Sequence, residues 1–211
     1  MTPRETKETC MELFKNCNAR QLANGLTWMN EPPEWGFEAH GLTIVPQAKT
    51  DFFRPCRGAP HDNACLLYVE VAGDFTAITH VRAHLVGFGD AAAITVRQDA
   101  TQWAKLCLER SPFGEVSAVS VVTDEWSDDA NNELLPRPEC YLRLTRKGNV
   151  FGMHYSQDGV RWRFVRTFGL AMPAAVKVGI HAQAPFVGGC RASFGTFTLS
   201  SEAVRDFRSG E

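Results

Sequence analysis

Residues 91–110, AAAITVRQDATQWAKLCLER, contain two runs of alternating apolar and polar residues around a short polar turn. Because side chains point alternately to the two faces of a strand, the runs predict an antiparallel hairpin. One face is apolar. The other face carries Arg97, Trp103, Lys105, Cys107 and Glu109. An aromatic side chain among charges of both signs is the composition of a groove for a polar ligand, so the hairpin suggests a binding site as well as a fold.

The same alternation covers most of the remaining sequence, in short runs separated by Gly, Pro, Asn and Asp. The clearest runs are 42–45, 64–71, 74–86, 116–123, 141–146, 150–155, 161–168, 176–183 and 191–199. About a dozen short strands at regular spacing predict an all-β sandwich or barrel.

The bulk composition excludes several classes of partner. The chain has 211 residues, of which 44% are hydrophobic and 22% charged, as in one soluble globular domain. A net charge of -2 gives no basic footprint, so we expect neither nucleic acid nor a membrane surface as a partner. No apolar run reaches the roughly 20 residues of a membrane span, and the first residues lack the apolar core of a signal peptide. These observations predict a cytoplasmic protein.

Seven cysteines, an odd number, stand in no CxxC pair and in no cluster with histidine at zinc-ligand spacing. We therefore expect reduced, mostly buried thiols, with no metal and no cofactor. Exposed strand edges make a homodimer a further possibility.

The N-terminal residues have a helical pattern. Residues 2–5, TPRE, fit a helix capping box with proline at the first helical position. An apolar stripe at helical spacing follows, formed by Cys10, Leu13, Phe14 and Cys17. We predict a short helical appendage at 1–24, which packs on the main body or contacts a partner. The β-sandwich then covers 25–201, and a polar tail at 202–211 frays.

The order of several short motifs resembles a known family. The motifs are WMNEPPEW at 28–35, TDFFR at 50–54, GDF at 73–75, VRQD at 96–99, WAK at 103–105, VVT at 121–123, LRLTR at 142–146 and YSQDG at 155–159. Together they resemble the concanavalin A-like jelly-roll family that includes the fungal "regulation of enolase" protein and bacterial sugar-operon proteins.

This resemblance implies a two-sheet concanavalin A-like jelly-roll sandwich with one concave face, and relatives by fold hold sugars on that face. The sequence departs from the family at one point. Members often carry Asp-Gln-Ala-Gly ahead of the arginine strand, whereas this chain has GDAAA at 89–93. A glutamine that could face the groove is therefore missing, which suggests a different ligand.

Polar residues on the non-core faces of the predicted strands form the candidate binding site. They are Arg97, Trp103, Lys105, Glu109, Tyr141, Arg143 and His181, with His154 as a further candidate. If their strands are neighbours in one sheet, an indole could stack on a sugar while charged groups bind hydroxyls or the carboxylate of a sugar acid. The alternative is a solvated sheet face with cross-strand ion pairs, such as Arg97 with Glu109.

Three other features carry alternative interpretations. Asp51 could orient a basic residue of the groove or cap a turn, and we favour the cap. Residues 156–162, SQDGVRW, look like an Asp-box, whose role is to hold a local turn. Residues 124–138 form the longest irregular stretch, an acidic loop that could cover the groove or bind a partner. Its acids lack the spacing of a calcium loop.

Three functions remain open from the sequence. The first is a carbohydrate or sugar-acid binding protein. The second is an enzyme on small glycans (a hydrolase, lyase or epimerase), with Glu109 as the candidate acid or base and His181 or Tyr141 as its partner. The third is a regulatory partner of a metabolic enzyme, which the acidic loop and the helical face with Leu13 and Phe14 would contact.

Overall fold

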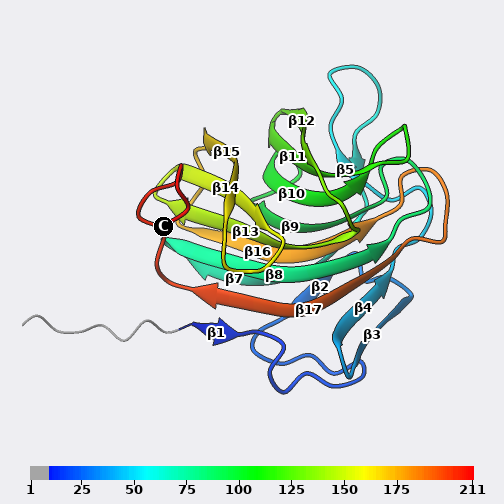
Figure 1. Cartoon of the computed structure of the whole chain (residues 1–211), viewed down its shortest axis with the longest axis horizontal. Helices are drawn as coiled ribbons and strands as arrows, with labels where there is room; N and C mark the ends of the chain where they lie inside the picture. The colour runs from blue at the N-terminus through cyan, green and yellow to red at the C-terminus, as the bar shows by residue number, and fades with distance from the viewer. Residues whose placement is uncertain (1–9) are drawn as a thin grey trace, which may run out of the picture.

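The computed structural model describes residues 10–211, and every regular element in this range is a β-strand. Nearly all strands belong to two antiparallel sheets that pack face to face (Figure 1). The all-β, two-sheet architecture predicted from the sequence is therefore confirmed. No helix in the described part of the chain is long and apolar enough to cross a membrane.

The eight-stranded sheet has the order β15-β14-β13-β8-β17-β4-β3, with β1 paired to β17. Its strands are β1 (Met11–Glu12), β3 (Glu34–Glu38), β4 (Gly41–Val45), β8 (Phe75–His84), β13 (Glu139–Lys147), β14 (Val150–Ser156), β15 (Arg163–Gly169) and β17 (Arg191–Ser200). The seven-stranded sheet has the order β12-β11-β10-β9-β16-β7-β2. Its strands are β2 (Thr27–Met29), β7 (Cys65–Ala72), β9 (Ala91–Arg97), β10 (Gln102–Arg110), β11 (Val116–Asp124), β12 (Trp126–Leu134) and β16 (Ala175–Gln183).

The core lies between the two sheets and follows the predicted alternation. On β10, Ala104, Leu106 and Leu108 face the core, and none of them is exposed to solvent. The facing strands supply Leu142 and Leu144 of β13 to the same cluster. Burial of each such leucine contributes about 1.5–3 kcal/mol, so the inner faces of the strands hold the sandwich together.

A second apolar cluster lies on the outer face of the seven-stranded sheet. Residues 51–63, called the insert below, carry the short pair β5 (Phe52–Phe53) and β6 (His61–Asp62). Phe52 is fully buried against Trp103, Cys107 and Val121 of the sheet. The insert therefore covers part of a face that the sequence alone predicts to be open.

The predicted N-terminal helix is not seen from residue 10 onward, and the capping box at 2–5 lies outside the described residues. Strand β1 is followed by turns in which Asn16 has a φ of 67° and Ala19 a φ of 48°. A right-handed helix cannot include positive φ values, so the stripe at helical spacing folds as strand and turns. Leu13 and Phe14 are buried, and Phe14 packs 5.1 Å from Phe37. The segment thus packs on the body, and these two side chains are not available as a contact surface for a partner.

The acidic stretch at 124–138 is not a loop. Most of it forms β12, which pairs with β11 as the edge of the seven-stranded sheet. Asp and Asn are rare in strands, which is why the sequence favours a loop here, but charge on an edge strand prevents pairing with another chain. Two of its acids also reach the edge of the other sheet: Asp128 bonds Arg166 at 2.7 Å and Glu133 bonds Arg163 at 3.1 Å.

The polar C-terminal residues pack against the body of the protein. They lie along the outer face of the eight-stranded sheet, beside β13 and β14 (Figure 1). His154 Nε2 donates to the carbonyl of Phe207 at 2.7 Å, and Arg143 Nη2 donates to the carbonyl of Gly210 at 2.8 Å. Each sheet therefore has a separate segment of chain on its outer face.

Candidate functional site

A pocket of about 170 Å³ opens on the outer face of the seven-stranded sheet, beside the insert. Its floor contains the buried side chains of Lys105 and Gln183, with Glu109 half-buried next to them. Phe88 and Phe186 stand at its mouth, 47% and 59% exposed, with their rings stacked 5.4 Å apart. The remaining lining residues are Asp51, Phe53, Gly89, Val119, Val121, Asp129 and Pro185. The pocket thus combines a polar floor with an aromatic rim.

Lys105 is fixed in the floor by three acceptors. Its Nζ donates to Asp51 Oδ1 at 3.2 Å, to the Phe52 carbonyl at 2.8 Å and to Gln183 Oε1 at 2.8 Å. An ammonium group has three N–H donors, so none remains for a ligand. Burial favours loss of the proton, but the Asp51 carboxylate raises the pKa of Lys105 above its usual value. Asp51 therefore orients the lysine, and our prediction that it caps a turn is wrong.

His181 lies beneath the pocket and is completely buried. Its Nε2 is 3.2 Å from Gln183 Oε1, and its Nδ1 is 2.7 Å from the Thr95 hydroxyl. Because the amide oxygen can only accept, Nε2 is the protonated nitrogen and the Thr95 hydroxyl donates to Nδ1. Burial and the charge of Lys105 lower the pKa of His181 to about 3. The imidazole is therefore neutral and supports Gln183, without direct access to a ligand.

Glu109 and Asp129 are the two acids of the pocket that form no ion pair among the described residues, and Glu109 is the more deeply buried of the two. Burial raises the pKa of its carboxyl group to about 7. Lys105 opposes this rise, while the charges of Asp51 and Asp129 add to it. Near neutral pH the carboxyl group can therefore donate or accept a hydrogen bond inside the pocket.

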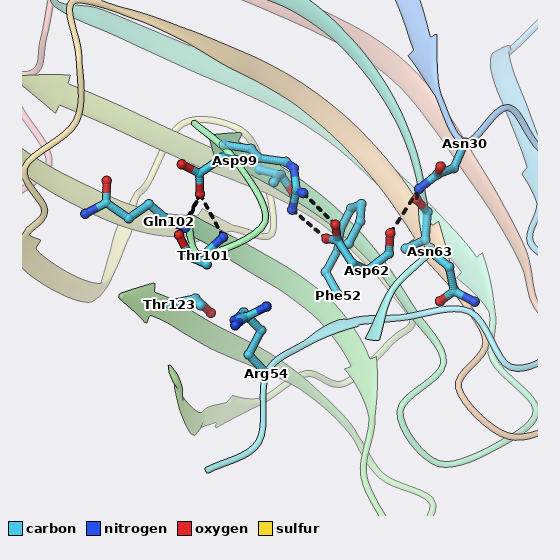
Figure 2. A network of polar contacts seen from close by, with 12 residues as sticks. Asn30, Phe52, Arg54, Asp62, Asn63, Asp99, Thr101, Gln102 and Thr123 are labelled. Carbon is cyan, nitrogen blue, oxygen red and sulfur yellow. Dashed lines mark hydrogen bonds and ion pairs between the residues drawn. The ribbon is translucent and has the colours of Figure 1, made fainter. Parts of the chain in front are cut away.

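Arg97 and Trp103 lie on the same sheet face as Lys105, but the insert covers them. Trp103 is 1% exposed and packs 6.1 Å from Phe52. Arg97 forms an ion pair with Asp62 at 2.9 Å and lies 5.0 Å from the Phe52 ring centroid. Asn30 holds the other side of the insert by donating to the Asp62 carbonyl at 3.2 Å (Figure 2). Neither predicted residue can reach a ligand while the insert is in place.

The register of the hairpin also separates Arg97 from Glu109, the two residues proposed above as a cross-strand ion pair. Trp103 stands opposite Arg97, whereas Glu109 stands opposite Ala91, six residues away along β9. At about 3.3 Å per residue the two side chains lie roughly 20 Å apart along the strands, so the cross-strand pair between Arg97 and Glu109 is not formed. Asp99 closes the turn by accepting from the backbone N–H groups of Thr101 at 2.7 Å and Gln102 at 3.0 Å (Figure 2).

Tyr141, Arg143 and His154 belong to the other sheet. They lie on the outer face of β13 and β14, so the prediction that they converge with Lys105 and Glu109 is wrong. Tyr141 packs 4.5 Å from the His80 ring, and the Arg143 guanidinium lies 4.2 Å from the Trp162 ring centroid. The alternation of residues identifies outward-facing side chains but not the sheet to which each strand belongs.

The Asp-box beside Tyr141 has the predicted local role. Asp158 Oδ1 accepts the backbone N–H groups of Val160 at 2.9 Å and Arg161 at 2.8 Å. These bonds lower the pKa of Asp158 to about 2. The turn also places Trp162 over Arg143, a contact that the motif itself does not reveal.

Among the polar and aromatic residues of the pocket, the sequence does not single out Phe53, Phe88, Gln183 or Phe186, and it places Asp129 only within the acidic stretch at 124–138. Gln183 follows His181 at alternate spacing on β16, which is the one sequence signal that could have identified it. Phe88 and Phe186 lie in loops, where no periodicity marks them. No group of three or more His, Cys, Asp or Glu side chains within residues 10–211 could hold a metal ion.

The two sheets define an all-β jelly-roll sandwich with a pocket on one outer face, and solved structures share this fold. The GH43 protein BlXynB from Bacillus licheniformis matches with a TM-score of 0.70 and 15% identity, over 96% of this chain and 40% of that chain. The carbohydrate binding module CBM66 from Bacillus subtilis matches with a TM-score of 0.51 and 14% identity, over 88% of this chain and 98% of that chain. At these identities the likeness shows the fold alone.

The chain belongs to the family described as "Protein of unknown function (DUF1349)", whose model matches residues 28–202. It is 31% identical over 183 residues to "Regulation of enolase protein 1" of Saccharomyces cerevisiae, covering 86% of this chain and 91% of that protein. The crystal structure of a functionally unknown protein from the same yeast matches with a TM-score of 0.79 and 30% identity, over 84% of this chain and 97% of that chain. The family expected from the order of motifs is therefore confirmed.

Proposed function

We propose that this protein is a cytoplasmic carbohydrate-binding protein whose pocket takes one ring of a small neutral sugar. The observation that carries the proposal is the stacked pair Phe88 and Phe186 above the polar groups of Glu109 and Gln183. Ligand pockets typically combine apolar walls with a few polar groups that fix orientation. Seven free cysteines fit a reducing compartment.

The size of the pocket supports a small ligand. A volume of about 170 Å³ corresponds to the share of liquid volume of about six water molecules, each near 30 Å³. That space suits a single sugar ring. A longer glycan would place one terminal ring inside and leave the rest in solvent.

The charges around the pocket favour a neutral sugar over a sugar acid. Lys105 is paired with Asp51 and has no free N–H group, while Glu109 and Asp129 add negative charge. A ligand carboxylate would meet these acids without a free cation to bind it, and its burial would cost several kcal/mol. We therefore set aside the sugar-acid alternative for this pocket.

Thermal unfolding in the presence of neutral monosaccharides and of uronic acids tests the proposal. A ligand at a hundred times its Kd stabilises the folded state by about 2.7 kcal/mol, which raises Tm by roughly 5–10 °C for a chain of this size. The Phe186→Ala variant should lose most of this shift. Phe113→Ala is the matched control, because Phe113 is 89% exposed and does not line the pocket. A uronic acid that binds as tightly as its neutral sugar, or no sugar that binds, would overturn the proposal.

A second candidate function rests on Glu109 itself. A carboxyl group with a pKa of about 7 is suited to general acid or base work near neutral pH, as a hydrolase, lyase or epimerase requires. Proton NMR of any bound sugar, followed over days, separates the two functions. Conversion by the wild type but not by Glu109→Gln would support the enzyme, and an unchanged sugar would leave a binding protein.

A third candidate is a regulatory partner of a metabolic enzyme, which the name of the yeast relative suggests. Leu13 and Phe14 are buried and cannot contact a partner, so the contact surface of this protein would be β12, where Trp126 is 55% exposed. Purified enolase should then bind the wild type and bind Trp126→Ala at least tenfold more weakly, a loss of about 1.4 kcal/mol. Absence of binding in a calorimetric titration would remove this candidate.

A further inference from the structure

Arg143 is a buried cation without a counterion. Its side chain lies on the outer face of the eight-stranded sheet, and the residue is 5% exposed. Its guanidinium lies 4.2 Å from the centroid of the Trp162 ring, and its Nη2 donates to the carbonyl of Gly210. No carboxylate of the described residues forms an ion pair with it, and its Nε has no hydrogen-bond partner. Burial of the charge alone lowers the pKa of Arg143 to about 10.

The neighbouring His154 does not supply the missing charge. It is fully buried on β14, and its Nε2 donates to the carbonyl of Phe207. Burial and the positive charge of Arg143 lower the pKa of His154 to about 4, so the imidazole is neutral. Its Nδ1 has no partner either. Two adjacent buried side chains on this face therefore have unused polar atoms.

A cavity of about 380 Å³ lies next to Arg143, over strands β8 and β17. Hydroxyl groups line it from Thr76, Thr198 and Ser200, and Arg143 forms part of its wall. Arg205 and the exposed acids Glu202 and Glu211 lie among the C-terminal residues that complete the lining. The Thr76 hydroxyl already donates to the Glu202 carbonyl at 2.7 Å, so Thr198 and Ser200 supply the hydroxyl groups for a ligand. The cavity thus combines one unpaired buried cation with two hydroxyl groups, and both kinds of group can donate to phosphate and carboxylate oxygens.

We propose that this cavity is an oxyanion site, in which a phosphate or carboxylate group of a small ligand supplies the counterion that Arg143 lacks. The site is on the opposite face of the sandwich from the sugar pocket and shares no residue with it. A failure of the carbohydrate proposal would therefore leave this proposal unaffected, and the reverse also holds. The ligand class of this site also differs, because the buried cation here, Arg143, has no carboxylate partner among the described residues, whereas the buried Lys105 of the sugar pocket is already paired with Asp51.

Isothermal titration of the whole chain with inorganic phosphate and, separately, with acetate tests the site, at an ionic strength held constant with sodium chloride. We expect saturable binding of at least one anion. The variant Arg143→Gln should weaken it by about tenfold or more, since a charge-assisted hydrogen bond is lost. Arg191→Gln is the matched control: Arg191 is an exposed arginine of the same sheet, outside the cavity, and its replacement should leave the affinity unchanged.

The variant Ser200→Glu keeps the test decisive if Arg143→Gln does not fold. A carboxylate introduced at Ser200, on the lining of the cavity, would itself serve as the counterion of Arg143. We expect this variant to fold with a raised Tm and to lose anion binding. The proposal is overturned if neither anion binds the wild type saturably at about 10 mM, well above a millimolar Kd. Equal binding by Arg143→Gln or by Ser200→Glu would overturn it as well.

Discussion

The two outer faces of the sandwich bury basic side chains in different ways. On the seven-stranded sheet, the insert at 51–63 brings a carboxylate to each buried cation: Asp51 to Lys105 and Asp62 to Arg97. On the eight-stranded sheet, the C-terminal residues give Arg143 one backbone carbonyl, that of Gly210, and no carboxylate that pairs with it. A buried charge is costly unless it is paired and hydrogen-bonded, so the first face is electrostatically complete and the second is not.

This difference indicates what each face can bind. Where the protein supplies its own carboxylates, the groups left unpaired are acids, Glu109 and Asp129, and the fitting ligand is neutral. Where a cation lacks its carboxylate, the fitting ligand is an anion. The covering segment, rather than the strand that carries the basic residue, therefore decides the chemistry of each face.

The variant Lys105→Met should have the largest effect on this comparison. It leaves Asp51 without its cation, beside Glu109, and removes the donor to Gln183 and to the Phe52 carbonyl. Removal of one partner of a buried pair costs about 3–5 kcal/mol, which urea unfolding at pH 7 would measure. The double variant Lys105→Met, Asp51→Asn should recover part of this loss.

The corresponding change on the other face, Arg143→Met, should cost less than about 1 kcal/mol, since it removes a buried charge that has no counterion. The two methionine variants can be compared in the same urea experiment. Equal losses would show that Arg143 is as well compensated as Lys105, and the distinction between the two faces would then disappear.

The pH dependence of stability tests the acid in the sugar pocket. Glu109 has a pKa of about 7 in the folded protein, against an ordinary value of 4.5. The folded state therefore holds the carboxyl proton of Glu109 more tightly than the unfolded state does. The contribution of this proton to the free energy of unfolding is complete below pH 4.5 and is lost as the pH rises through 7. The glutamine side chain of the Glu109→Gln variant stays neutral at every pH. At pH 8 this variant should therefore be more stable than the wild type by about 3 kcal/mol, with little difference at pH 4.5.

Urea unfolding at several pH values measures this difference. Glu115→Gln provides the control, because Glu115 is an exposed acid in the turn after β10 and its replacement should not change the pH profile. If the two stability profiles differ by the same amount at every pH, the ionised form of Glu109 is not destabilised in the folded state, and the prediction is wrong.

The variant Asp62→Asn tests the other pair under the insert. It leaves Arg97, whose side chain is 5% exposed, with a neutral partner, although the Asp62 side chain itself is 36% exposed. We expect a loss of about 1–3 kcal/mol, smaller than for Lys105→Met because solvent reaches the pair. Hydrogen exchange of the Asn63 and Ala64 amides, which donate to the Asp51 carbonyl, should accelerate as the insert loosens. Unchanged exchange would show that Phe52 alone holds the insert in place.

The faces of the strands could be predicted from the sequence because alternation is local, and β9 and β10 follow it residue by residue. The partners of their polar side chains could not. Asp51 and Lys105 are 54 residues apart, and nothing in TDFFR shows that this segment crosses the sheet. The composition of β12 predicts a loop because it reflects an edge position. Arg143 faces outward as alternation predicts, but it belongs to the other sheet, because alternation does not reveal sheet membership.

The smallest effect should come from the ion pairs that join the edges of the two sheets. Asp128 bonds Arg166 at 2.7 Å, but the Asp128 side chain is 71% exposed. Solvent screens such a pair, so Asp128→Asn should change the free energy of unfolding by no more than about 0.5 kcal/mol, and added salt should reduce even that. A loss above about 1 kcal/mol would give the edge pairs a share of stability comparable to the Asp62 pair. Stability would then depend on whether a basic residue has a carboxylate partner, at the exposed edges as much as under the insert. The insert would no longer be the feature that distinguishes the two outer faces.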